Sequence, residues 1–385
     1  MSWNQQTGKA FNKQKILQTI FTKKLLSRNE LIEMTGLKKA TVANLVSELL
    51  QEQLLVEAGK EQSTGGRRSH ILRVNDKAGY AIGIDVGVNY LRGEIINFAG
   101  ETVFEKVQPI ANKDFNVYLK HIYTLIDMLC LQVPESPYNI LGIGVAIPGT
   151  IDSDGIILEA PNLKWTNNDL RVRLQRKYEV PIHVMNEADA GAYAEYTLAP
   201  NQSTQNLIYI SIGIGIGVGM FINEQFYKGS NGISGESGHA VINMFGRQCT
   251  CGRIGCWEAY ASEFALLQEA AEIYPTKPVS LEFLVQQADK GHPQMTTLFQ
   301  EFGKYVAIGI TNLIHTLNPD KVVIGNRITK AKPYIKAAIL ETVQANAMPH
   351  HLENCEILFA SNEERSTVLG AAVLSIFHFI ENDIM

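Results

Sequence analysis

The sequence lacks any apolar run long enough to cross a membrane. One uncharged run, Leu207 to Ile222, spans 16 residues, fewer than the roughly 20 that a spanning helix needs. Glycine alternates with isoleucine or valine from Gly213 to Gly219, which is typical of a buried strand and turn. The first 12 residues contain no apolar segment of the signal-peptide type. We therefore expect a cytoplasmic protein with no membrane partner.

Cysteine is scarce and unevenly placed. The five cysteines are an odd number, and three of them fall within eight residues. A disulfide framework is therefore not expected, since crowded thiols in a reducing compartment are typical of metal ligands. The five are Cys130, Cys249, Cys251, Cys256 and Cys355.

Length and charge indicate several domains with different partners. A chain of 385 residues with 45% hydrophobic and 19% charged residues is globular and long enough for two or three domains. Residues 1–75 hold 12 Lys and Arg against 6 Asp and Glu, a net +6, whereas the remaining 22 against 33 net −11. A basic segment joined to an acidic body favours a protein that contacts phosphates at one end only.

Three helices are predicted at the N-terminus. Asn12 to Lys24 is amphipathic, and Ser27 with Glu30 forms a capping box for a second helix that ends at Gly36. A third helix, Lys39 to Gln51, buries one apolar face. The apolar positions of the first and third helices are Ile16, Leu17, Ile20, Phe21, Val42, Leu45, Val46 and Leu49.

The other face of the third helix is small and polar. Two helices around a glycine turn are the geometry that places a recognition helix in the major groove. A hairpin of Leu54 to Glu57 and Ser69 to Val74 would form a wing. A small helical protein-interaction domain is the alternative. The candidate DNA-binding residues are Lys38, Lys39, Ala40, Thr41, Asn44 and Ser47 on the helix and Arg67 and Arg68 on the wing.

Beyond a hinge at Asn75 to Gly79, strands and helices alternate. Tyr80 to Val86 is a predicted buried strand, Asn89 to Asn97 and Glu101 to Val107 form a hairpin, and a helix near Thr367 to Phe379 closes the chain. This alternation predicts an α/β body.

Ordered motifs in the body carry a family resemblance. The chain resembles the ROK family of repressors, open reading frames and kinases over nearly its whole length, and residues 80–90 and 136–152 look most like bacterial xylose repressors. The motifs are Asp85-Val86-Gly87, Ile147-Pro148-Gly149, Pro161-Asn162-Leu163 with Trp165, Asn186-Glu187-Ala188, Gly235-Glu236-Ser237-Gly238-His239, and Cys249-Thr250-Cys251-Gly252 with Gly255-Cys256-Trp257-Glu258.

The resemblance implies a multidomain fold. A winged helix-turn-helix over 1–75 would precede a two-lobed α/β body of the actin-like, sugar-kinase (ribonuclease H-like) type. We place the first lobe at 79–185 with the C-terminal helix of 366–385, and the second lobe, with the sugar site and zinc loop, at 186–365.

One imidazole and three thiols lie within 18 residues, at His239, Cys249, Cys251 and Cys256. Soft thiolates with one histidine suit a closed tetrahedral Zn²⁺ site of structural type. Free cysteines with a core histidine are the alternative. The resemblance implies the same four ligands and places six residues around a sugar, namely Asn162, Asn186, Glu187, Glu236, His239 and Glu258. Their carboxylates and amides suit vicinal hydroxyls, although Asn186 and Glu187 can also cap a helix and Glu258 can be a surface residue.

The kinase motifs of the family are altered here. Where its kinases resemble Asp-x-Gly-Gly-Thr, this chain has Asp85-Val86-Gly87-Val88-Asn89, and where they have Gly-Thr-Gly it has Gly213-Ile214-Gly215. Glu187 stands at the aspartate base, and Gly325-Asn326 replaces Gly-Gly. Phosphoryl transfer depends on positioning, so we predict no catalytic residues and no enzymatic turnover.

These features predict a transcriptional repressor. A homo-oligomer, dimer or tetramer, would bind palindromic operator DNA and release it when a monosaccharide, D-xylose by resemblance, closes the two lobes. Two alternatives are an active ATP-dependent sugar kinase with an appended DNA-binding domain, and a protein sequestered by a phosphotransferase component.

Overall fold

The computed structural model describes residues 5–60, 70–152, 154–199 and 204–384. The chain divides into two compact units. Unit 1 comprises Met1–Val145, Leu170–Val184 and Ala371–Met385, and unit 2 comprises Ala146–Asp169 and Met185–Gly370. None of the described helices combines the length and the apolar character needed to cross a bilayer.

The N-terminal module of unit 1, residues 5–74, combines three helices with a small antiparallel sheet of order β1-β3-β2. Its elements are α1 Gln5–Lys23, β1 Leu26–Ser27, α2 Arg28–Thr35, α3 Lys39–Gln51, β2 Leu55–Lys60 and β3 His70–Val74. The eight predicted apolar positions of α1 and α3 are all buried. The predicted wing residues Arg67 and Arg68 lie outside the described residues.

Local signals set the ends of α2. The Ser27 side chain accepts from the Glu30 backbone N–H, the Glu30 carboxylate accepts from the Ser27 N–H, and Gly36 ends the helix at φ 67°, as the capping box and glycine predicted. Helix α1 begins at Gln5 rather than at the predicted Asn12, because its first turns are polar and give no apolar periodicity.

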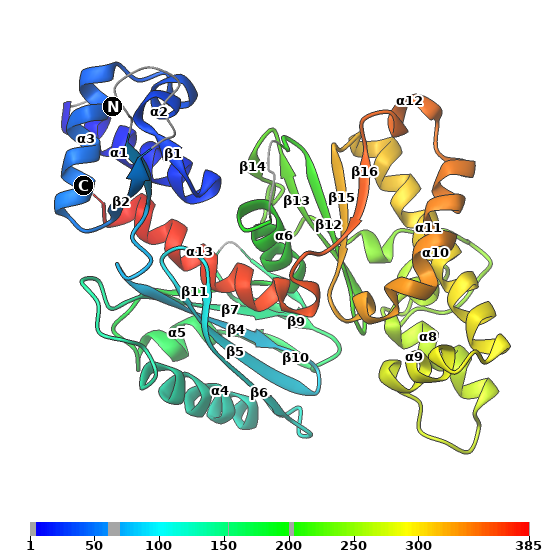
Figure 1. Cartoon of the computed structure of the whole chain (residues 1–385). Helices are drawn as coiled ribbons and strands as arrows, with labels where there is room; N and C mark the ends of the chain where they lie inside the picture. The colour runs from blue at the N-terminus through cyan, green and yellow to red at the C-terminus, as the bar shows by residue number, and fades with distance from the viewer. Residues whose placement is uncertain (1–4, 61–69, 153, 200–203, 385) are drawn as a thin grey trace. The chain divides into compact units, whose positions relative to one another are not determined.

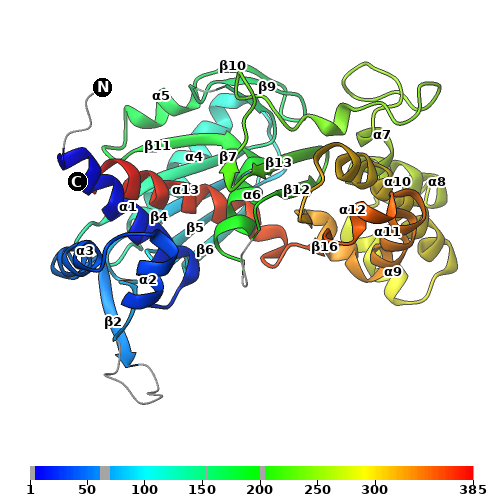
Figure 2. The same cartoon turned by 90° about the horizontal axis from the view of Figure 1, so that it is seen from above.

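The module packs against the end of α13 (Ser366–Asn382) within unit 1. The rings of Phe21 and Phe377 meet edge to face with centroids 5.3 Å apart, and the Gln14 side chain donates to the Glu381 carbonyl at 2.6 Å. Figures 1 and 2 both show α1 beside this end of α13. The first and last helices of the chain therefore form one junction.

A five-stranded sheet, ordered β11-β7-β4-β5-β6, forms the rest of unit 1. Its strands are β4 Tyr80–Val86, β5 Tyr90–Asn97, β6 Thr102–Pro109, β7 Ile140–Ile147 and β11 Ile182–Asn186, and its helices are α4 Phe115–Cys130, α5 Leu170–Gln175 and α13. In Figure 1, α4 and α13 lie on opposite faces of this sheet. A side chain at Gly144 would come within 1.8 Å of the Ala371 carbonyl oxygen, so glycine permits α13 to approach β7.

Unit 2 is built on a second five-stranded sheet of order β14-β13-β12-β15-β16. Its strands are β12 Leu207–Ile212, β13 Ile216–Ile222, β14 Gln225–Phe226, β15 Lys321–Gly325 and β16 Glu356–Phe359. A smaller sheet joins β8 Thr150–Ile151, β9 Ile157–Ala160 and β10 Trp165–Asn168. The helical elements are α6 Glu187–Thr197, η1 Ser237–His239, α7 Glu258–Ala261, α8 Glu263–Ile273, α9 Leu281–Asp289, α10 Pro293–Leu317, η2 Arg327–Ala331, α11 Lys332–Asn346, α12 Pro349–Leu352 and η3 Glu363–Arg365.

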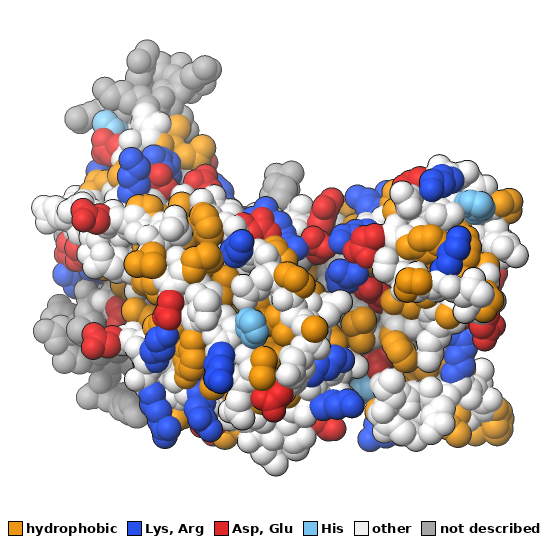
Figure 3. Space-filling view, turned by 90° about the horizontal axis from the view of Figure 1, so that it is seen from below, with side chains coloured by type: hydrophobic (Ala, Val, Ile, Leu, Met, Phe, Trp, Pro, Cys, Tyr) orange, Lys and Arg blue, Asp and Glu red, His pale blue; other side chains and the backbone are white. Residues whose placement is uncertain are grey.

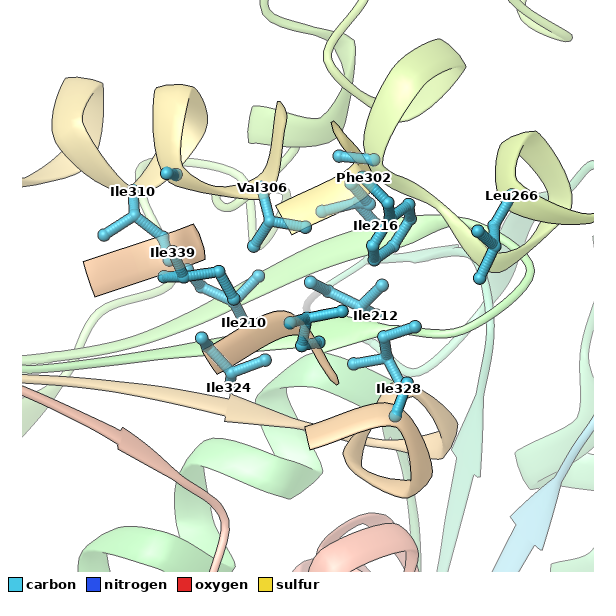
Figure 4. Packing of buried hydrophobic residues seen from close by; sticks show 14 of the residues in the cluster. Ile210, Ile212, Ile216, Leu266, Phe302, Val306, Ile310, Ile324, Ile328 and Ile339 are labelled. Carbon is cyan, nitrogen blue, oxygen red and sulfur yellow. The ribbon is translucent and has the colours of Figure 1, made fainter. Parts of the chain in front are cut away.

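Both faces of the central strand β12 are buried. Ile210 and Ile212 point into the core formed with Val306 and Ile310 of α10, as Figure 4 shows. By alternation the intervening residues face α6, where Tyr209 packs with Ala192. Burial on both faces explains why this run is apolar throughout and confirms the predicted buried strand.

The glycines after β12 serve close packing. A side chain at Gly219 would come within 2.4 Å of the Ala188 carbonyl oxygen on α6, and one at Gly217 within 2.9 Å of the Ala188 Cβ. The alternating pattern therefore sets how near α6 lies to β13, and with it where the first turn of α6 falls.

The observed units differ from the predicted lobe boundaries in residues 146–169, at Met185 and within α13. Residues 146–169, which we assigned to the first lobe, group with unit 2. They are held there by two hydrogen bonds, in which the Gly149 carbonyl accepts from the Asn186 amide and the Thr150 hydroxyl donates to Glu236. Helix α13 is divided, with residues 366–370 in unit 2 and the rest in unit 1.

Charges of both signs are mixed on the described surface seen in Figure 3. Within the N-terminal module several basic residues are neutralised by acidic ones, as in Lys9 with Glu48 and the buried Lys13 with Glu52. Lys38 and Lys39 form no ion pair with any described residue. Their charge remains available to a partner.

Candidate functional site

Four predicted ligands lie together in unit 2. The ligand atoms of His239, Cys249, Cys251 and Cys256 lie within 4.8 Å of one another. His239 Nδ1 is 3.8 Å from Cys249 Sγ, and the Sγ atoms of Cys251 and Cys256 are 3.7 Å apart. Tetrahedral Zn²⁺ with Zn–S bonds of about 2.3 Å requires ligand separations of about 3.8 Å. The donor set and spacing therefore fit a zinc ion.

The loop that carries these ligands is anchored in the core. Short bridges pair Val241 with Cys256 and Gln248 with Ile254, and the Trp257 indole donates to the Tyr305 carbonyl at 2.8 Å. Trp257 is 1% exposed. This anchor directs the following residue, Glu258, at the start of α7.

Glu258 connects the cysteine loop to the turn after β12. One carboxylate oxygen accepts from the Ile216 backbone N–H at 2.9 Å, and the other accepts from the Thr250 hydroxyl at 3.3 Å. A side chain at Gly215 would lie 2.5 Å from Glu258 Oε2 and 3.7 Å from Asn162 Nδ2. Asn162 and Glu258 therefore face the same point of the turn, and Gly215 keeps that point open.

Asn186 caps α6, which is the role that the sequence offered as an alternative to a sugar contact. Its amide oxygen accepts from the Ala188 N–H at 2.7 Å, and its amide nitrogen donates to the Gly149 carbonyl at 2.8 Å. Glu187 follows as the first helical residue, half-buried, and accepts from the Ser211 hydroxyl at 3.3 Å.

Glu236 is the most exposed of the six sugar-site candidates, and it accepts from the Thr150 hydroxyl at 3.1 Å. Because Gly149 and Thr150 are adjacent in the chain, their two hydrogen bonds hold Asn186 and Glu236 close to each other. All six candidates belong to unit 2, where they lie around the turn after β12 and the start of α6.

The DNA-binding candidates lie on one face of α3 and at its N-terminus. Lys38, Lys39, Ala40, Asn44 and Ser47 are exposed and Thr41 is half-buried, opposite the buried apolar face. The described candidates on α3 are therefore accessible opposite its buried face.

The sequence did not reveal that the Tyr90 side chain packs into the loop that begins with Asp85-Val86-Gly87. The Tyr90 hydroxyl donates to Asp85 at 2.9 Å, and a side chain at Gly87 would come within 2.2 Å of the Tyr90 ring. The Tyr118 hydroxyl donates to the Gly87 carbonyl at 2.9 Å. Thr150 and Ser211 were missed as well. The one signal for Ser211 was a hydroxyl inside an otherwise apolar strand.

Asp189 is a buried carboxyl on the first turn of α6. Burial raises its pKa to about 7, an effect that Lys228 opposes and Glu236 reinforces. Folding therefore favours the protonated form. The stability associated with this proton is complete below the ordinary carboxyl pKa near 4 and is lost as pH rises to about 7.

We expect Asp189→Asn to raise the melting temperature by several degrees at pH 8, because the amide never has to ionise or take up a proton. At pH 5 the gain should be smaller, since the penalty is then only partly developed. Thermal unfolding of both proteins at pH 5, 6, 7 and 8 measures this. A gain independent of pH would show that Asp189 does not titrate over this range.

Comparison with known proteins identifies the family. A sequence profile of the ROK family matches residues 81–377, well over half of the chain. The chain belongs to the ROK family. Among its ROK relatives, the xylose repressor of Bacillus subtilis is 37% identical over 373 residues, covering 97% of each chain. The xylose repressor of Caldicellulosiruptor bescii is 35% identical over 388 residues, covering 96% of each.

Solved ROK structures share the fold. A ROK family transcriptional regulator, a homolog of the Escherichia coli MLC protein, aligns with a TM-score of 0.78 at 25% identity, over 98% of this chain and 97% of that one. A ROK family glucokinase from Streptomyces griseus in complex with glucose and AMPPNP aligns with a TM-score of 0.69 at 21% identity, over 77% of this chain. The two-lobed kinase-like body predicted from sequence is confirmed.

Proposed function

We propose that the chain is a sugar-responsive transcriptional repressor, which binds operator DNA through its N-terminal module and releases it when D-xylose occupies unit 2. The main support is the full-length similarity to proteins named xylose repressors. The arrangement of the polar groups in each unit supports the two binding activities separately.

A winged helix-turn-helix is our proposal for the N-terminal module, and its three helices and small sheet support it. Helix α3 follows α2 after the left-handed Gly36 and exposes a small polar face, which fits the major groove. Lys38 and Lys39 are suited to phosphates, Asn44 to an adenine edge and Ala40 to a thymine methyl. We propose that Arg67 and Arg68 add wing contacts.

In unit 2, candidate acceptors and donors lie near the turn after β12 and the first turn of α6. The carboxylates of Glu187, Glu236 and Glu258 can accept from sugar hydroxyls, and the amide of Asn162 can both donate and accept. Asn186 would act mainly by orienting the start of α6. His239 directs Nδ1 to the cysteines, so its other ring nitrogen remains suited to a sugar oxygen.

A structural Zn²⁺ would be held by His239, Cys249, Cys251 and Cys256. When bound, the ion supplies four bonds that fix the loop, with no open position for water. The chain's own residues then orient the sugar, since Glu236 precedes the histidine by three residues and Glu258 follows Cys256 by two. A prearranged site loses less entropy on binding.

We propose that the chain does not phosphorylate its sugar. The Tyr90 ring covers Gly87 and its hydroxyl donates to Asp85, so Gly87 is buried and is not open to a phosphate. In the second loop Ile214 offers no hydroxyl. A coupled assay for ADP release with ATP and several sugars tests the kinase alternative, and steady turnover would support it.

Helix α13 is the proposed connection between the sugar and the operator. Its first residues belong to unit 2, where the Ser366 hydroxyl donates to Glu195 at 2.8 Å and the Thr367 hydroxyl to the Glu187 carbonyl at 3.5 Å. Its end packs on α1 in unit 1. Sugar contacts at Glu187 would therefore change the position of α13, and α13 packs against the DNA-binding module. In a homodimer or tetramer this would change half-site spacing.

Operator binding with and without D-xylose tests the proposal. Coupling between sites is typically worth about 1–3 kcal/mol, so saturating sugar should weaken operator binding about 5- to 150-fold. Fluorescence anisotropy with a labelled palindromic promoter fragment measures it. Glu236→Ala should keep full operator affinity but need about tenfold more sugar for release. Operator affinity that D-xylose leaves unchanged would contradict the proposed inducer, and release by a phosphotransferase domain alone would support the sequestration alternative.

A further inference from the structure

We propose that Ser211 and Asn326 are positioning residues for the sugar site, which hold the Glu187 carboxylate through a relay of two hydrogen bonds. This inference rests on the proposed function. The Asn326 amide nitrogen donates to the Ser211 hydroxyl at 2.9 Å, and that hydroxyl donates to Glu187 Oε1 at 3.3 Å. Ser211 is fully buried and Asn326 is 5% exposed.

The direction of the relay is fixed by its donors. The Asn326 amide oxygen accepts from the Arg327 N–H at 2.7 Å, so the amide nitrogen is the group that faces Ser211. A serine hydroxyl has one proton. Because the oxygen of Ser211 already accepts from Asn326, its proton is available to Glu187, and the carboxylate is held in one orientation.

Strand register places the three residues together. Ser211 pairs with Gly325 at the carboxyl ends of the parallel strands β12 and β15. Ile210 and Ile212 point to the α10 side, so Ser211 faces α6 and its first residue, Glu187. A side chain at Gly325 would come within 2.1 Å of the Tyr209 hydroxyl, so this close strand end requires glycine.

The backbone of Asn326 has a strained conformation, which other interactions of this residue must hold in place. At φ 68° and ψ −163° it occupies a region that is almost restricted to glycine. A non-glycine residue persists there only when other interactions hold it. A side chain at Gly213 would lie 3.2 Å from the Asn326 amide nitrogen, so Gly213 leaves room for this amide. The side-chain hydrogen bonds of Asn326 therefore explain why a residue other than glycine occupies this position.

Asn326→Gly separates positioning from structural support. Glycine relieves the strain, so the variant should melt at the same temperature as the unsubstituted protein or higher. Its sugar affinity should nevertheless fall about 5- to 20-fold. Asn326→Asp keeps the acceptor for Arg327 but loses the donor to Ser211, and it should lose affinity to a similar extent.

Isothermal titration of the full-length, zinc-loaded protein with D-xylose, L-arabinose and D-glucose is the test, with melting temperatures measured in parallel. Ser211→Ala should bind about 5- to 20-fold more weakly, and the double variant with Asn326→Gly no more weakly than the weaker single variant, because both break one relay. Thr311→Val, which removes a buried hydroxyl of α10, is the control and should bind normally.

The outcomes separate the two proposals. If the unsubstituted protein binds none of the sugars, the proposed function and this inference both fail. If it binds a sugar and Asn326→Gly and Ser211→Ala bind it equally well, only the relay is overturned. Additive losses in the double variant, or normal binding by Asn326→Asp, would also overturn it.

Discussion

Cys256→Ser is expected to abolish the sugar response and to lower the melting temperature by about 10 °C or more. Cys256 is fully buried and joins two parts of the loop through its bridge to Val241. Three remaining ligands would hold zinc weakly, and a structural zinc site contributes folding energy directly. Glu236 and Glu258, which flank the loop, would lose their fixed separation.

Zinc content, thermal unfolding and sugar titration measure this prediction. Cys130→Ser is the matched control, since Cys130 lies on α4 in unit 1 and is no ligand candidate. It should retain one zinc per chain and normal sugar binding. A Cys256→Ser protein that keeps its zinc and its inducer affinity would contradict the proposed ligand set.

The double variant Lys38→Glu with Lys39→Glu is expected to bind operator at least about 100-fold more weakly. Each reversal would replace a proposed phosphate contact with repulsion, and neither lysine is neutralised by a described acidic residue. The slope of log affinity against log salt should fall by about 2, since each phosphate contact contributes about 0.9.

Anisotropy titrations at several salt concentrations measure both quantities. Lys106→Glu changes an exposed lysine of β6 in the same unit and should have little effect. Sugar affinity should be unchanged in the double variant, because all six proposed sugar-site residues belong to unit 2. Normal operator binding would exclude α3 as the DNA-contacting helix and favour the protein-interaction alternative.

Local chemistry made much of the fold predictable. The Ser27 and Glu30 side chains define a helix start within four residues, and Lys39 to Gln51 was predicted with its observed bounds because every turn repeats the apolar face. The metal cluster was predictable for the same reason, since three of its four ligands lie within eight residues.

Long-range contacts were not predictable. Ser211 and Asn326 are 115 positions apart, and Thr150 and Glu236 are 86 apart. Neither pair has a repeating signal that would reveal its partner. Asn326 was noted only as a departure from Gly-Gly, because its hydrogen bond depends on the register of β12 and β15. Tyr90 was similarly counted as a strand residue, although its ring fills the preceding loop.

The junction between α1 and α13 affects how the chain matures during synthesis. Gln14 and the Glu381 carbonyl that it contacts are 367 positions apart, so α1 can complete this contact only after α13 has been synthesised. A product of premature termination would lack the end of α13, against which its N-terminal module packs. Such fragments should therefore be cleaved by proteases more readily than intact chains.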